Sequence, residues 1–185
     1  MKRVQELVRD QFFTDIALFR SVPGFLLQFG QAVGESRWNT ATIEDDHPSP
    51  RPRITRGTLS FAGGGTNSRT NQLFFAYCAG DACGQLGEQP WETSVGELVG
   101  DESFETLDRL ERAHAYGDMP PWGQGPAPDK IAADADGSYL RRFPDLAYLK
   151  GCELLGELGG ARAAAAAAEE PRTPHANHPA SADEL

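Results

Sequence analysis

Basic residues are scarce in this sequence, and their scarcity narrows the range of partners. The 185 residues include 17 Lys and Arg against 27 Asp and Glu, which gives a formal net charge of −10. Proteins that bind nucleic acids carry basic patches that neutralise backbone phosphates. We therefore expect no nucleic-acid partner for this chain.

Long hydrophobic runs are also missing. A membrane span needs roughly 18 or more consecutive apolar residues, and no run in the sequence approaches that length. The first residues, MKRVQE, are charged and polar, so they do not read as a secretory signal. We expect no membrane partner, and 39% hydrophobic with 24% charged residues is a globular composition.

Cysteine and histidine are too few and too scattered to indicate a metal site. The three cysteines, Cys78, Cys83 and Cys152, lack the paired spacing of zinc ligands, and the four histidines share no common spacing. Cys78 and Cys83 either form a disulfide or stay free thiols of apolar character, and free thiols are the interpretation we favour. The glycine run 63–65 lacks the Gly-Lys-Ser/Thr ending of a phosphate loop and reads as a turn. No metal or other cofactor is predicted.

Apolar periodicity predicts a mainly β chain. Strands are expected over residues 16–22, 25–29, 56–62, 72–77, 94–99 and 148–155. Strand 72–77 has apolar or aromatic residues on both faces, so we expect it at the centre of a sheet. Helices are expected at the start of the chain and after Asp101, a helix-capping residue. Residues 34–53 read as a long polar loop. Many short strands with few helices favour a barrel or a sandwich.

The composition changes after about residue 158. Six alanines at 163–168 are followed by proline, histidine, asparagine and acidic residues. So short an alanine run is marginal as an isolated helix. We therefore expect one domain over residues 1–158 and a disordered tail over 159–185. The last residues, Ala182-Asp183-Glu184-Leu185, resemble retrieval signals of the endoplasmic reticulum, so its lumen is the predicted location, with a cytoplasmic or plastid location as the alternative.

One segment concentrates side chains that suit a binding site. Residues 19–30 read FRSVPGFLLQFG, two short strands joined by a Pro-Gly turn. Side chains on one face of a strand recur at every second position, so Leu26 and Gln28 share a face. Folding one strand back on the other brings Arg20, Phe25 or Leu26, and Gln28 around a shallow hollow. A cation and an amide beside apolar walls suit an apolar ligand with one carbonyl, such as a prolyl peptide.

Two motifs in order resemble the signatures of the cyclophilin-type peptidyl-prolyl cis-trans isomerases. The first is FRSVPGFLLQFG, and the second is GTLSFA at 57–62 followed by NSRTNQLF at 67–74. The resemblance covers roughly residues 4–155 and implies an eight-stranded closed barrel capped by two helices, with the site on its outer face. Segments near 45–48, 116–118 and 123–126 are similar to a branch of the family common in bacteria and algae.

The resemblance also implies roles for individual residues. Arg20 is implied to be the catalytic arginine, and Gln28 to position Arg20 and the substrate backbone. The residues implied to line the proline pocket are Phe25, Leu26 and Phe74.

Further residues complete the implied site. Ala62 and Gly63 are implied to meet the residues before proline, Gln72 to support the site and Leu86 to close one wall of the pocket.

The sequence departs from the family pattern in four places, one of which is the unusual loop flanked by Cys78 and Cys83. The family's first two strands have no counterpart before the first helix. Either the sequence is a fragment or a mis-started gene model, which is the interpretation we favour, or the fold is incomplete. Gly63 stands where many members have asparagine. The wall position that often carries tryptophan falls at Gln85, and Trp91 is the alternative occupant.

This chemistry needs no bond to be broken. The barrier to rotation about the Xaa-Pro bond, roughly 18–20 kcal/mol, reflects lost amide resonance. Twisting returns a lone pair to the proline nitrogen, to which an arginine N–H can donate, while dry apolar walls strengthen that interaction. We therefore expect a cofactor-free, monomeric isomerase that acts on proline-containing peptides and on unfolded or folding proteins. The alternatives are a cyclophilin-like module that binds proline peptides with weak or no turnover, and a non-functional fragment.

Overall fold

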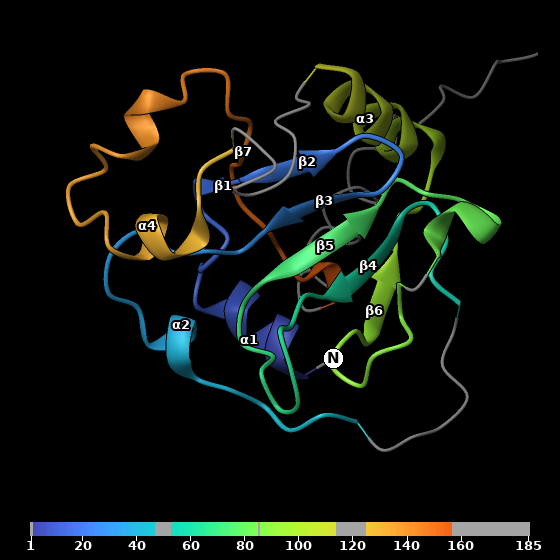
Figure 1. Ribbon diagram of the computed structural model, residues 1–185, viewed down its shortest axis with the longest axis horizontal. Helices are drawn as coiled ribbons and strands as arrows, with labels where there is room; N and C mark the ends of the chain where they lie inside the picture. The colour runs from blue at the N-terminus through green and yellow to red at the C-terminus, as the bar shows by residue number, and fades with distance from the viewer. Residues whose placement is uncertain (1, 47–52, 85, 114–124, 157–185) are drawn as a thin grey trace, which may run out of the picture. The chain divides into compact units, whose positions relative to one another are not determined.

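Five short antiparallel strands form the main sheet. The computed structural model describes residues 2–46, 53–84, 86–113 and 125–156. In spatial order the strands are β2 (Arg20–Val22), β3 (Leu26–Phe29), β5 (Leu73–Ala76), β4 (Thr58–Phe61) and β6 (Ser94–Glu97) (Figure 1). A second sheet pairs β1 (Ile16–Ala17) with β7 (Tyr148–Leu149). The described residues are thus mainly β, and β5 is central as predicted; they hold seven strands where the resemblance implies eight.

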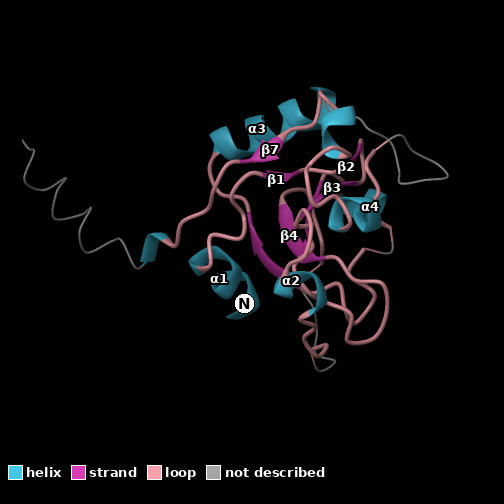
Figure 2. Cartoon of the chain, turned by 90° about the vertical axis from the view of Figure 1, so that its left-hand side faces the viewer, coloured by secondary structure: helices cyan, strands magenta, loops and turns pink. Residues whose placement is uncertain are grey.

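The helices are short apart from one. They are α1 (Lys2–Arg9), α2 (Arg37–Thr40), α3 (Asp101–Ala113) and α4 (Pro128–Ala132), with two 3-10 turns, η1 (Gly80–Cys83) and η2 (Leu140–Arg142). The two longest helices, α1 and α3, lie apart with strands of the sheets between them in both views (Figure 1, Figure 2). Acidic residues in the first turn of α3 and Arg112 in its last turn suit the helix dipole.

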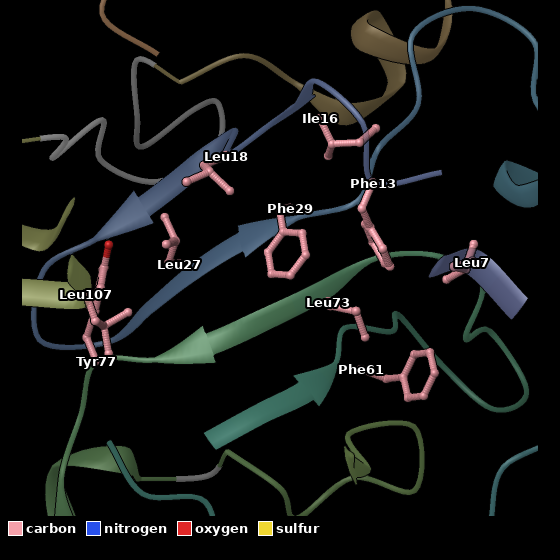
Figure 3. Packing of buried hydrophobic residues seen from close by; sticks show 10 residues of the cluster. All are labelled: Leu7, Phe13, Ile16, Leu18, Leu27, Phe29, Phe61, Leu73, Tyr77 and Leu107. Atoms are coloured by element: carbon pink, nitrogen blue, oxygen red, sulfur yellow. The ribbon is translucent and has the colours of Figure 1, made fainter. Parts of the chain in front are cut away.

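Alternation along the strands sends every second side chain into the core. Leu27 and Phe29 from β3 meet Leu73 from β5 and Phe61 from β4, and all are at most 4% exposed. Leu7 from α1 is fully buried and belongs to the same cluster (Figure 3). The helix face of α1 therefore closes one side of the core that the sheet builds.

Two expected strands differ from the observed ones. Residues 16–22 form two strands in different sheets. Strand β1 pairs with β7, and the Leu18 N–H extends this pairing by donating to Ala147 O at 2.9 Å, whereas β2 pairs with β3. The strand expected over 148–155 ends at Leu149. The polar loop 34–53 also contains α2, which Ser36 caps through the Trp38 N–H.

A separate apolar cluster stabilises the region around α4. Ile131 and Leu140 pack with Ala17 and Phe19. Asp134, only 5% exposed, accepts hydrogen bonds from the backbone N–H groups of Tyr139 and Leu140. The carboxylate therefore stabilises a turn.

The chain divides into two units, Met1–Glu153 and Leu154–Leu185. Of the second, only residues 154–156 are described. The predicted tail with its C-terminal tetrapeptide, the segment 116–118 and Gln85 all lie outside the described residues, so these predictions stay predictions. Among the described helices, none is long and apolar enough to cross a bilayer.

The core can be tested at Leu27, which is 2% exposed. Leu27→Ala should lower the free energy of unfolding by about 2–5 kcal/mol, because it leaves a cavity. Val99→Ala is the control, since Val99 is 77% exposed, and it should change stability by less than about 0.5 kcal/mol. Denaturant unfolding measures both, and equal effects of the two substitutions would contradict this description of the core.

Candidate active site

The centre of the candidate site is one row of paired residues that crosses three neighbouring strands. Arg20 on β2 pairs with Gln28 on β3, and Gln28 pairs with Phe74 on β5. Residues paired directly across an antiparallel sheet point to the same face. Because Leu27 and Phe75 point into the core cluster, this row points to the opposite face of the sheet.

A chain of amide hydrogen bonds connects the polar side chains. Arg20 Nη1 donates to Gln28 Oε1 at 3.2 Å, and Gln28 Nε2 donates to Gln72 Oε1 at 2.8 Å. Gln72 Nε2 in turn donates to Gln31 Oε1 at 2.8 Å, and Gln31 Nε2 donates to Ala32 O at 3.3 Å. Each amide accepts through oxygen and donates through nitrogen, so the chain runs in one direction. The oxygen of Gln28 therefore faces the guanidinium of Arg20.

Gln31 is a member of this chain that sequence reasoning missed. It is 6% exposed, and it follows Gly30, whose φ is +99°. A Cβ on Gly30 would lie 2.3 Å from Asn71 O, so only glycine allows the two backbones to approach. That close approach brings Gln31 beside Gln72. The sequence signal that could have indicated Gln31 is a glycine followed by a glutamine at the end of a strand.

The apolar residues predicted to form the pocket lie in one cluster. Leu26 and Phe74 are buried in it, and the half-buried members at its edge are Phe25, Ala62 and Leu86. Ile54, which is 1% exposed, also belongs to it and was not predicted. The guanidinium carbon of Arg20 lies 5.7 Å from the ring centroid of Phe25. The polar chain and the apolar cluster therefore meet at Arg20 and Phe25.

Helix α3 anchors the turn between β2 and β3. The Gly24 N–H donates to Glu111 Oε1 at 2.6 Å. Glu111 also pairs with Arg56 at 2.9 Å, and Arg56 bonds Asp108 as well. Burial acts to lower the pKa of Arg56, but hydrogen bonds to the two carboxylates outweigh it and raise that pKa. This ion-pair group fixes the turn that carries Phe25.

Cys78 and Cys83 form a disulfide, so the free-thiol interpretation is wrong. The turn η1 folds the chain back and brings the two Cα atoms to 4.9 Å, which is within the usual range for a disulfide. Both cysteines are buried in the apolar cluster. The Cys78 N–H donates to Phe25 O at 3.3 Å, and Cys83 O accepts from the Leu86 N–H at 3.1 Å. The disulfide therefore links two walls of the predicted pocket.

A hollow of about 240 Å³ adjoins the amide chain. Its lining residues are Gln28, Ala62, Gly63, Gly64, Ser68, Thr70 and Gln72. Within the described part of the chain, the backbone N–H and carbonyl of Gly63 make no hydrogen bond. Ser68 Oγ closes the glycine turn by accepting from the Gly64 N–H and donating to Gly65 O. The hollow thus offers unpaired backbone groups beside fixed amides.

The rim of this glycine turn is fixed from outside by charged and polar groups. Asp45 and Asn67 exchange two hydrogen bonds, each from a backbone N–H to the other's side chain, at 2.7 and 2.9 Å. Arg69 is 2% exposed and donates to Asp46 at 2.8 Å. That hydrogen bond lowers the pKa of Asp46, partly offset by burial. In the described residues, no three His, Cys, Asp or Glu side chains are grouped as metal ligands would be.

The geometry defines a site on the outer face of an antiparallel sheet, with one arginine, an amide chain and an apolar cluster. Residues 1–129 match the family model described as "Cyclophilin type peptidyl-prolyl cis-trans isomerase/CLD". The chain therefore belongs to the cyclophilin-type peptidyl-prolyl cis-trans isomerase family, as the sequence motifs predicted.

Curated relatives support this membership over part of their length. The chain is 33% identical over 113 residues to "Peptidyl-prolyl cis-trans isomerase-like 2" of Emericella nidulans, covering 57% of this chain and 18% of that protein. It is 26% identical over 114 residues to "Peptidyl-prolyl cis-trans isomerase-like 3" of Gallus gallus, covering 57% of this chain and 64% of that protein. The chain thus spans less than a fifth of the fungal relative and less than two thirds of the avian one.

A solved structure supports the fold. A cyclophilin type peptidyl-prolyl cis-trans isomerase of Cryptosporidium parvum, crystallised in the presence of the dipeptide Ala-Pro, superimposes with a TM-score of 0.50. The match has 23% sequence identity and covers 66% of this chain and 75% of that one. The mainly β, cyclophilin-like fold class is therefore confirmed.

Reduction of the disulfide should loosen the pocket wall locally. In the chain-entropy model, closing so short a loop is worth roughly 2 kcal/mol, so reduction should leave the core folded. Amide hydrogen exchange at Leu86 should accelerate about tenfold in dithiothreitol, while exchange at Leu73 on β5 stays unchanged. A Cys152→Ser variant is the control, since Cys152 is exposed and unpaired with another cysteine. Unchanged exchange at Leu86 would contradict the link.

Proposed function

We propose that this chain accelerates cis–trans isomerisation of Xaa-Pro bonds in unfolded and folding proteins. One observation carries the proposal: Gln28 holds the guanidinium of Arg20 beside the apolar cluster of Leu26 and Phe74. The reaction needs a hydrogen-bond donor next to a proline-sized apolar surface. It breaks no bond and takes no cofactor.

Arg20 would act on the twisted amide rather than on the planar one. Loss of planarity makes the proline nitrogen basic, and an arginine N–H can then donate to its lone pair. Such a donor accelerates the step only if it is already in place when the bond twists. The bond from Arg20 Nη1 to Gln28 Oε1 fixes the plane of the guanidinium before substrate binds. The amide chain behind Gln28 would keep that oxygen from rotating away.

The apolar cluster would hold the proline ring while the preceding carbonyl swings. Phe25 and Leu86 are half-buried at its edge, so substrate would cover surface that water now touches. The residues before proline would run over Ala62 and Gly63 towards the hollow. There the backbone groups of Gly63, which make no hydrogen bond with the residues that the structure describes, can bond a peptide backbone. The Ala-Pro dipeptide named with the Cryptosporidium structure supports a proline peptide as the ligand class.

A binding module with weak turnover is the second candidate. Both amide atoms of Gln28 are engaged within the protein, and Gly63 lacks the asparagine side chain that the resemblance implies at this position. Such a site can hold a proline peptide without favouring the twisted amide. Turnover measured together with binding separates the two candidates.

The role of Arg20 can be tested by NMR exchange spectroscopy of an Ala-Pro peptide. Arg20→Ala should lower kcat/KM about 100-fold, since removing one preorganised donor typically costs that much. Arg20→Lys should lose most of the activity too, because an ammonium lacks the planar fork of donors. The matched control is Arg109→Ala, an exposed arginine on α3 that donates to Thr106 Oγ1. Peptide binding without exchange by the native chain would favour the module instead.

Gln31 should act through the amide chain. Gln31→Leu leaves the Nε2 of Gln72 without its acceptor, which costs about 1–3 kcal/mol when the group is buried. We expect kcat to fall several-fold with little change in KM, because the change disturbs the position of Arg20 and not the apolar cluster. Gln31→Glu keeps the accepting oxygen and should retain more activity. Equal losses in the two variants would show that Gln31 only supports stability.

A further inference from the structure

Gly63 lacks a side chain because Trp91 occupies the space that one would need. A Cβ on Gly63 would lie 2.8 Å from both Cβ and Cδ1 of Trp91, and 2.9 Å from Ser68 Oγ. Cβ atoms essentially never approach so closely. The φ of Gly63 is outside the left-handed region, so the backbone conformation does not require glycine. Glycine is needed at this position because any side chain would overlap Trp91.

Two segments of the site hold Trp91 in this place. The Phe61 N–H donates to Thr93 O at 3.1 Å, which fixes the chain two residues after Trp91. The Gly87 N–H donates to Glu92 Oε2 at 2.8 Å, which ties the same turn to the residue after Leu86. Trp91 is thus attached to the strand end that leads into Ala62 and to the loop that carries Leu86.

The position of Trp91 places an aromatic ring beside the path of a bound peptide. Ala62 belongs to the apolar cluster and also lines the hollow, and Gly63 follows it along that hollow. A chain whose proline sits in the cluster therefore passes Gly63 as it leaves. Trp91 is half-buried, and it lies next to Gly63, which lines the hollow.

We propose that Trp91 determines which residue is accepted before proline, and that it selects apolar and aromatic residues over acidic ones. This inference rests on the proposed function, because the hollow must receive the substrate. An apolar side chain gains contact with the indole, and aromatic pairs gain most. The net charge of −10 acts in the same direction, since it disfavours an acidic ligand.

Four peptides that differ only before proline test the proposal. With Ala, Leu, Phe or Glu at that position, the native chain should favour Leu-Pro and Phe-Pro in both Kd and kcat/KM. Trp91→Ala should weaken these two by about threefold to tenfold, the range that aromatic contacts support, and leave Ala-Pro within about twofold. Trp91→Phe should keep most of the preference. Trp38→Phe is the control, because Trp38 lies on α2 and packs with Arg3 and Arg37.

A second comparison separates packing from recognition. Gly63→Ala alone should displace the indole and reduce the apolar preference. Added to Trp91→Ala, it should cost nothing further in apolar preference, because the indole is already absent. It should still lower Tm, because the overlaps with Cβ of residue 91 and with Ser68 Oγ remain. Equal weakening of all four peptides by Trp91→Ala, or no change, would overturn the inference while the proposed function stands. A native chain that binds none of the peptides would overturn both, and one that binds without exchange still tests Trp91 through Kd.

Discussion

The antiparallel register of β3 between β2 and β5 is the constraint on which the rest of the structure depends. Leu27 and Phe29 point into the core, while Leu26 and Gln28, which alternate with them along β3, point to the site. A slip of one residue would exchange these two sets and bury the glutamine in the apolar core. The same pairing that stabilises the fold therefore sets Gln28 opposite Arg20 on one side and opposite Phe74 on the other.

Several independent contacts support this row from outside the sheet. The amide chain holds Gln28 from one side, through Gln72 and Gln31. Helix α3 holds the turn before Phe25 through Glu111. The disulfide connects Cys78, which donates to the carbonyl of Phe25, to Cys83, which accepts from the N–H of Leu86. Each contact restrains a different wall. A rigid donor beside a dry surface is what stabilisation of a twisted amide requires.

The sequence predicted the parts of the site that depend on local pattern. Strand alternation and the Pro-Gly turn predicted Arg20, Phe25 and Gln28 as neighbours, and the structure brings them together, although of the three Gln28 alone lines the hollow of about 240 Å³. The motif resemblance added Phe74 from a distant strand. Contacts that depend on tertiary packing were missed. Gln31 is drawn in by a backbone approach at Gly30, Ile54 by burial behind Leu86, and the disulfide by the turn η1. The break between β1 and β2 was missed for the same reason, since β1 pairs with β7, a strand that lies far along the chain.

The most direct test of the account is to map an Ala-Pro peptide onto the isotopically labelled chain by NMR. The account predicts that the side-chain amides of Gln28 and Gln72, the methyl groups of Leu26 and Leu86 and the backbone amide of Gly63 shift together, with a single Kd. These groups come from different strands and loops, and only a ligand in the site described contacts all of them. Shifts that gather on another face of the sheet, or a peptide that leaves these signals unmoved, would contradict it.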